Sequence, residues 1–84
     1  MNMFPEPIHR LDIHCSRRYG SAVAAGLQYQ QRAITGPQHA QVHDYIVLIQ
    51  GVQRGSGSGP SAKAAKSEAA RDALSYLQAA GELL

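Results

Sequence analysis

The sequence has little of what secreted domains, metal-binding modules and membrane proteins depend on. Its 84 residues include one cysteine, no tryptophan and one phenylalanine. A single cysteine, Cys15, excludes an internal disulfide and a zinc site built from cysteines of this chain alone, and we expect it to be a small core residue. No run of about 18 apolar residues is present, which excludes a transmembrane helix.

The N-terminal residues Met-Asn-Met-Phe-Pro-Glu-Pro lack the basic and apolar regions of a signal peptide. We therefore expect an intracellular protein, cytoplasmic or nuclear, with no membrane partner. A chain of 84 residues builds one modest core but no deep, well-walled cleft. The net charge of +2 is too small to identify a partner, so any electrostatic argument depends on where the charges cluster.

A glycine-rich segment is the most informative stretch, Gly55-Ser-Gly-Ser-Gly-Pro-Ser-Ala-Lys-Ala-Ala-Lys66. We expect a loop that leads into a helix with Ser61 as its N-cap and with Lys63 and Lys66 on one edge of its first turns. Free N–H groups and the positive end of the helix dipole favour phosphate there. A Walker phosphate loop is excluded because Gly59 is followed by Pro60-Ser61, while a solvated helix start remains the alternative.

Apolar spacing and turn residues predict the remaining elements. A helix is expected over 7–19, a connecting loop or a short helical extension over 20–26, a strand over 27–34 and a turn over 35–38. A strand over 42–50 follows, then a hairpin turn and a brief strand over 51–54, and after the glycine-rich loop a helix over 62–80 that ends at Gly81. Five apolar residues of this last helix keep helical spacing and are expected on its core face: Ala62, Ala65, Ala69, Ala73 and Leu77.

This order predicts an α+β fold, α-β-β-β-α, with two helices packed on one face of a three-stranded antiparallel sheet. We expect a single domain over residues 7–80, with a flexible N-terminal tail over 1–6 and a C-terminal tail over 81–84. Neither paired carboxylates nor a nucleophile elbow is recognisable, so no catalytic residue is assigned and no cofactor is expected. His39 and His43 would converge on a metal only along a helix, and we place them on a turn and a strand.

Two motifs carry a resemblance to the double-stranded RNA-binding domain family over about residues 7–80. The segment from Gly55 to Leu74 is similar, without a gap, to the family pattern Gly-x-Gly-x-Gly-x-Ser-Lys-Lys-x-Ala-Lys-x-x-Ala-Ala-x-x-Ala-Leu. Gly36-Pro-Gln-His39 resembles the Gly-Pro-x-His turn of the family, at the family's spacing from Gly51.

The resemblance implies non-catalytic binding of double-stranded RNA by shape, with contacts to two successive minor grooves and the phosphates between them. The first helix and the turn would each enter a minor groove, and the start of the last helix would bridge the phosphates. The RNA-binding residues that this implies are Gly36, Pro37 and His39 in the turn, Ser61, Lys63 and Lys66 at the last helix, and His9, Ser16 and Arg17 on the first helix.

A second hypothesis keeps the fold and makes it a protein-interaction module or a homodimer. It is motivated by Ala62, which stands where the family has a lysine, by the apolar Ile13 on the first helix, and by the small net charge. The sequence also leaves open whether the chain is part of a larger protein such as a ribonuclease or a helicase.

Overall fold

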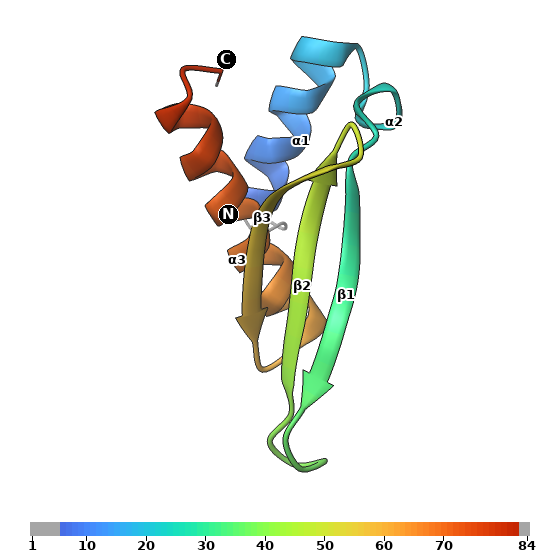
Figure 1. The fold of residues 1–84 in the computed structure, drawn as a ribbon, viewed down its shortest axis with the longest axis vertical. Helices are drawn as coiled ribbons and strands as arrows, with labels where there is room; N and C mark the ends of the chain where they lie inside the picture. Colours follow the sequence, from blue (N-terminus) through green and yellow to red (C-terminus); the bar gives the residue numbers. More distant parts are fainter. Residues whose placement is uncertain (1–5, 83–84) are drawn as a thin grey trace.

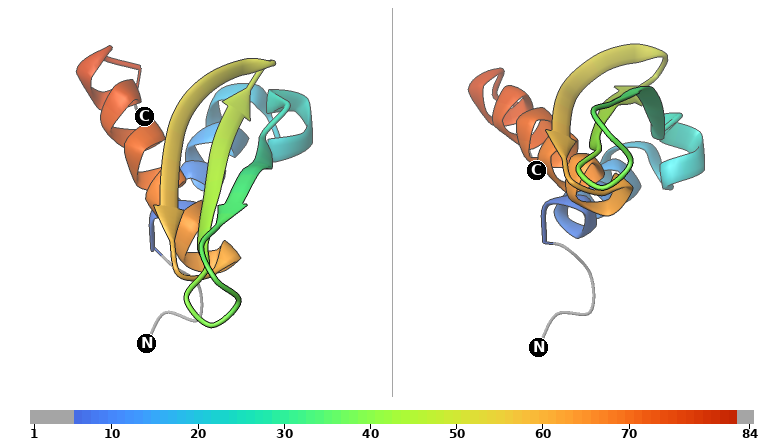
Figure 2. Two further views of the ribbon diagram at one scale, coloured as in Figure 1. Left: turned by 60° about the horizontal axis from the view of Figure 1, so that its bottom comes forward. Right: turned by 90° about the horizontal axis from the view of Figure 1, so that it is seen from below.

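The structure is a computed structural model in which residues 6–82 are described. Its elements are α1 (Glu6–Tyr19), α2 (Ala22–Ala25), β1 (Gln28–Thr35), β2 (Val42–Ile49), β3 (Val52–Gly59) and α3 (Ala62–Ala79). The strands form one antiparallel sheet in the order β1-β2-β3, and α1 and α3 lie on the same face of it (Figures 1 and 2). The predicted α+β fold is confirmed, and the short α2 lies in the segment whose structure the sequence left open.

The core lies between the central strand and the two long helices. Val47 of β2 is fully buried, as are Leu11 and Cys15 of α1. Ala62, the first residue of the predicted core face of α3, is only half-buried. The other four residues of that face are at most 3% exposed, as predicted: Ala65, Ala69, Ala73 and Leu77. Burial of their apolar surface is the main force that holds the helices on the sheet.

Strand β3 corrects the prediction of a brief strand followed by a glycine-rich loop. It continues through the glycine-rich segment to Gly59, and Ser56 and Gly59 pair with Ile46 and His43 of β2. Only Pro60 and Ser61 connect it to α3. The glycine-rich segment 55–59 lacks the β-branched and aromatic residues typical of strands, so its sequence predicts a loop. Pairing with β2 makes it part of a strand instead.

The glycines of β3 are required by the close approach of α3. A Cβ atom at Gly55 would lie 2.5 Å from the carbonyl oxygen of Ala69 and 2.6 Å from the backbone nitrogen of Ala73, and one at Gly57 would lie 2.6 Å from the carbonyl carbon of Glu68. Such separations are well inside van der Waals contact. Glycine therefore permits the α3 backbone to rest directly on the β3 backbone.

The hairpin between β2 and β3 is fastened to α2. Its two-residue turn has Gln50 at φ 56° and Gly51 at φ 75°, the combination of a type I′ turn. The Gln50 backbone N–H donates to the carbonyl oxygen of Ala25 at 2.8 Å, and its side-chain amide donates to that of Ala24 at 3.0 Å. The additional short helix thus braces one end of the sheet.

Both ends of the domain differ slightly from the predicted tails. Glu6 is the first residue of α1, whereas residues 1–5 and 83–84 of those tails lie outside the described residues. At the other end, Gly81 adopts φ 74°, and the N–H of Glu82 donates to the carbonyl oxygen of Leu77 at 2.8 Å. This is a Schellman closure, so Gly81 ends α3 as predicted.

Candidate nucleic-acid interface

The start of α3 combines a helix N-terminus with positively charged side chains. Ser61 has extended backbone angles, and its hydroxyl accepts a hydrogen bond from the N–H of Ala64 at 3.1 Å, which confirms it as the N-cap. The first turn, Ala62-Lys-Ala-Ala65, contains no acidic residue to balance the positive end of the helix dipole. Lysine at this end is unfavourable for an isolated helix, whereas a bound anion is favourable.

The two lysines near the start of α3 have different surroundings. Lys63 is exposed, whereas Lys66 is half-buried and its Nζ atom lies 5.3 Å from the centre of the Tyr45 ring on β2. This geometry is a cation–π contact. Tyr45 is only 8% exposed. The contact joins the start of α3 to the centre of the sheet, and sequence reasoning did not anticipate it.

The turn between β1 and β2 is a tight corner whose residues 36–40 are all exposed. Gly36 adopts φ 89°, and a Cβ atom there would lie 2.7 Å from the carbonyl oxygen of Ala40, so both the backbone angle and the space require glycine. The N–H of Ala40 donates to the carbonyl oxygen of Pro37 at 2.9 Å. This closed turn holds Pro37 and His39 at the outer end of the strand pair.

Helix α1 presents the third predicted group, and its His9, Ser16 and Arg17 are exposed. Ile13, between them along the helix, is 37% exposed, whereas Leu11 is fully buried. His9 also borders a hollow of about 270 Å³ between α1 and β1, whose other lining residues are Ile8, Asp12, Leu27 and Tyr29. The hollow places His9 beside the beginning of β1.

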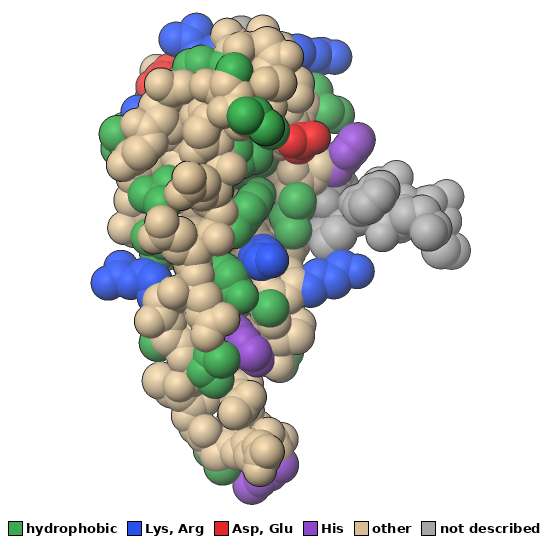
Figure 3. All heavy atoms as spheres, turned by 90° about the vertical axis from the view of Figure 1, so that its right-hand side faces the viewer, with side chains coloured by type: hydrophobic (Ala, Val, Ile, Leu, Met, Phe, Trp, Pro, Cys, Tyr) green, Lys and Arg blue, Asp and Glu red, His purple; other side chains and the backbone are tan. Residues whose placement is uncertain are grey.

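These groups are spread along the molecule instead of forming one pocket. The structure measures 40 Å along its longest axis, and the β1–β2 turn lies at one end of it (Figure 1). Figure 3, which faces the β1 side, shows Lys or Arg side chains at mid-height with histidines above and below them. Separated polar groups on an elongated side fit a long ligand better than a small molecule.

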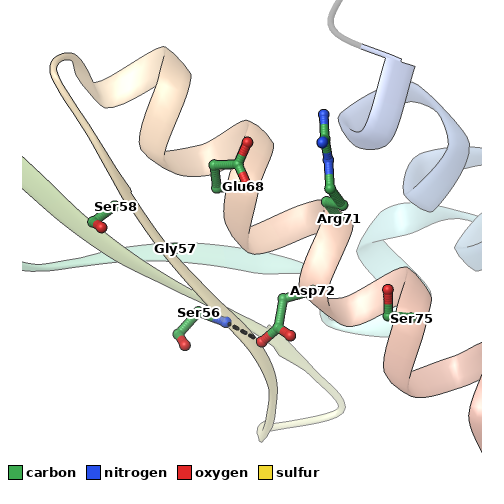
Figure 4. A pocket seen from close by; sticks show the side chains of 7 residues that line it. All are labelled: Ser56, Gly57, Ser58, Glu68, Arg71, Asp72 and Ser75. Atoms are coloured by element: carbon green, nitrogen blue, oxygen red, sulfur yellow. Dashed lines mark hydrogen bonds between the residues drawn. The ribbon is translucent and has the colours of Figure 1, made fainter.

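A polar hollow on the other side of α3 has the wrong charge for phosphate. It measures about 450 Å³ and lies between β3 and α3 (Figure 4). Glu68 and Asp72 line it together with Arg71, and the Asp72 carboxylate accepts a hydrogen bond from the backbone N–H of Ser56 at 3.0 Å. Two carboxylates oppose an incoming phosphate, so the interface does not extend around this side.

The histidines do not form a metal centre. Within residues 6–82, no group of three His, Cys, Asp or Glu side chains is arranged to hold a metal ion. His39 lies in the turn and His43 on β2, where the ring is half-buried and its Nδ1 atom is enclosed without a hydrogen-bond partner.

None of the helices in the described part of the chain is both long and apolar enough to cross a membrane. Residues 13–77 match the family described as double-stranded RNA binding motif. Over 48 residues, 57% of this chain, the sequence is 44% identical to ribonuclease 3 of Streptococcus pneumoniae strains Hungary19A-6 and CGSP14. The matched segment spans 21% of the length of each relative. With its helix, three-stranded antiparallel sheet and C-terminal helix, the chain belongs to the double-stranded RNA-binding motif family and is a double-stranded RNA-binding domain.

Proposed function

We propose that the domain binds the RNA duplex by its shape through three separate contacts. The Gly36–His39 turn and helix α1 reach successive minor grooves, and Ser61, Lys63 and Lys66 meet the phosphates between them. The observation that carries this proposal is the start of α3, where an exposed Lys63 and a half-buried Lys66 lie at a helix N-terminus whose first turn contains no acidic residue. The sugar 2′-hydroxyl groups available in the minor groove distinguish RNA from DNA.

The individual side chains have different roles in this proposal. Lys63 and Lys66 act as point charges toward phosphate oxygens. His39 either donates to a 2′-hydroxyl or accepts from one, because imidazole does both. On α1, His9, Ser16 and Arg17 make polar contacts around Ile13, which cannot form a hydrogen bond. The domain itself is non-catalytic, and the ribonuclease relatives support duplex RNA as the ligand of the shared segment.

The proposal is tested with a labelled RNA duplex of at least about 16 bp, a DNA duplex of the same sequence and single-stranded RNA. We expect the tightest binding to the RNA duplex. Lys63→Ala/Lys66→Ala should weaken that binding at least tenfold and reduce the slope of log affinity against log salt by about 2, since each lost phosphate contact changes it by roughly 1.

The matched control is Arg10→Ala/Arg71→Ala. It removes the same amount of charge from the edge of another hollow, between α1 and α3. We expect this control to bind the RNA duplex within about twofold of the unmodified protein, apart from a general charge effect. Equal losses in the two double variants would contradict a phosphate contact at the start of α3.

We propose self-association through the edge of the sheet as a second candidate function. β3 is an edge strand, and Val52 and Tyr76 near that edge are 48% and 47% exposed. Exposed strand edges and apolar side chains favour pairing between copies. Sedimentation velocity over a range of protein concentrations distinguishes this candidate from a monomer that binds duplex RNA.

A further inference from the structure

Tyr45 links the sheet to one of the two lysines proposed to contact phosphate. It lies on β2 opposite Gln31 of β1 and Gly57 of β3. Its hydroxyl donates to the Oε1 atom of Gln31 at 3.2 Å, and its ring lies under the Nζ atom of Lys66, 5.3 Å from ring centre to nitrogen. One side chain thus connects β1, β2 and α3.

The surroundings of Tyr45 keep its ring in one place. The side chain is 8% exposed, and a buried aromatic ring in a packed interior has little freedom to rotate about χ1. The hydrogen bond to Gln31 fixes the outer end of the ring. Gly57 on the other neighbouring strand contributes no side chain, so α3 approaches closely enough for Lys66 to reach over the ring.

A lysine held in this way has less entropy to lose on binding. A free lysine side chain samples many rotamers, and ordering it against a phosphate opposes binding. Attraction to the ring restricts Lys66 before RNA arrives, while the exposed side of the ammonium group keeps N–H donors for an oxygen. Lys63, which is exposed, is ordered only by its ligand.

We propose that Tyr45 is a positioning residue that holds Lys66 ready for a phosphate oxygen of the RNA duplex. This inference rests on the proposed function, because it requires Lys66 to contact the RNA backbone. It makes the two lysines unequal, since Lys66 is preorganised and Lys63 is not. It also assigns Gln31, on β1, an indirect contribution through the hydroxyl of Tyr45.

The first test is made without RNA, on the unmodified protein and on two variants at Tyr45. The proton signals of the Lys66 ε-methylene group should be shifted upfield by the ring beneath it, and those of Lys63 should stay near their random-coil positions. Tyr45→Phe should keep the Lys66 shift, and Tyr45→Leu should remove it. Equal, unshifted signals for the two lysines in the unmodified protein would overturn the positioning of Lys66.

The second test measures RNA affinity in a double-mutant cycle. We expect Tyr45→Leu to weaken binding about threefold to tenfold, and Tyr45→Phe and Gln31→Ala to weaken it no more than about twofold. In a Lys66→Ala background, Tyr45→Leu should cause no further loss beyond about twofold. The same loss in both backgrounds would show that Tyr45 acts on the fold alone and would overturn the inference.

The two tests separate this inference from the proposed function. If Lys66→Ala leaves RNA affinity unchanged, the proposed phosphate contact of Lys66 is wrong even where its ε-methylene signals are shifted. If Lys66→Ala weakens binding and the signals are unshifted, the contact stands and the role of Tyr45 is wrong. Should Tyr45→Leu fail to fold, the ε-methylene signals of Lys66 in the unmodified protein decide alone, and unshifted signals overturn the inference.

Discussion

The carboxylate of Asp72 on α3 accepts a hydrogen bond from the backbone N–H of Ser56 on β3, with an oxygen–nitrogen distance of 3.0 Å (Figure 4). β3 is at the edge of the sheet, so this N–H is a donor that another strand would use. A charged side chain that occupies the donor is one way in which proteins prevent pairing between edges. Asp72 therefore opposes the self-association considered above.

We expect Asp72→Ala to increase self-association, because it frees the Ser56 N–H and removes a negative charge from the edge. Asp72→Asn is the matched control, since its amide oxygen still accepts the hydrogen bond. Sedimentation velocity should show a larger concentration dependence for Asp72→Ala than for the unmodified protein or Asp72→Asn. Identical sedimentation of all three proteins would show that Asp72 does not protect the edge.

Gly57→Ala should destabilise the fold by about 3 kcal/mol, the upper range for overpacking. The new methyl group would overlap the backbone of α3 at Glu68 and Ala69, and backbone atoms of a helix cannot move aside as a side chain can. Urea denaturation measures the change in the free energy of unfolding. Ser58→Ala, at the exposed position directly after Gly57, should change the free energy of unfolding by less than about 0.5 kcal/mol. A similarly small change for Gly57→Ala would contradict the tight packing.

Substitutions at Ser61 should separate stability from RNA binding. Ser61→Ala loses the N-cap and should lower the free energy of unfolding by about 1 kcal/mol. It should weaken RNA binding only about twofold, because it removes one proposed phosphate contact and keeps the two lysines. Ser61→Asp keeps a cap acceptor and suits the helix dipole, but its carboxylate should repel phosphate and weaken RNA binding. Urea denaturation and fluorescence anisotropy test the pair, and unchanged RNA affinity of Ser61→Asp would place the phosphate away from the helix start.

His14 should make the fold sensitive to mild acid. Burial lowers the pKa of His14, nearby Arg18 lowers it further, and Glu82 acts in the opposite direction. The unfolded chain then binds a proton more readily than the folded chain, so stability is fully present above the ordinary histidine pKa of about 6.5 and declines as pH falls below it.

The measurement is the free energy of unfolding from urea titrations between pH 7.5 and pH 5.5. His14→Gln should reduce the decline over this range, whereas His9→Gln, at an exposed position, should leave it unchanged. A decline of the same size in His14→Gln and the unmodified protein would assign the acid sensitivity to other groups.

Features encoded by neighbouring residues were predictable from the sequence. The N-cap at Ser61, the buried spacing from Ala65 to Leu77 and the end at Gly81 depend on local backbone requirements, and all three are confirmed. Strand β3 was not predictable in the same way, because it depends on pairing with β2 and contact with α3. Tertiary context overrides weak local propensity in such a segment.

The candidate site likewise contains features that have a local sequence signature and features that depend on tertiary contacts. The motifs located the turn at Gly36 and the lysines of α3, whereas the contact of Lys66 with Tyr45 joins residues 21 positions apart in sequence and has no local signature. The buried position of His14 was also missed. Residue type alone does not distinguish His14, which is buried, from His9, which is exposed on the same helix.

The close contact between the glycines of β3 and the backbone of α3 affects which duplexes the domain can bind. At Gly55 and Gly57, where β3 has no side chain, backbone atoms limit how near the helix lies to the sheet, and no rotamer change at these positions can adjust that distance. The offset between the start of α3 and the Gly36–His39 turn is then nearly invariant. We expect duplexes whose groove spacing departs from A-form to be rejected because the protein cannot adapt its own spacing to theirs.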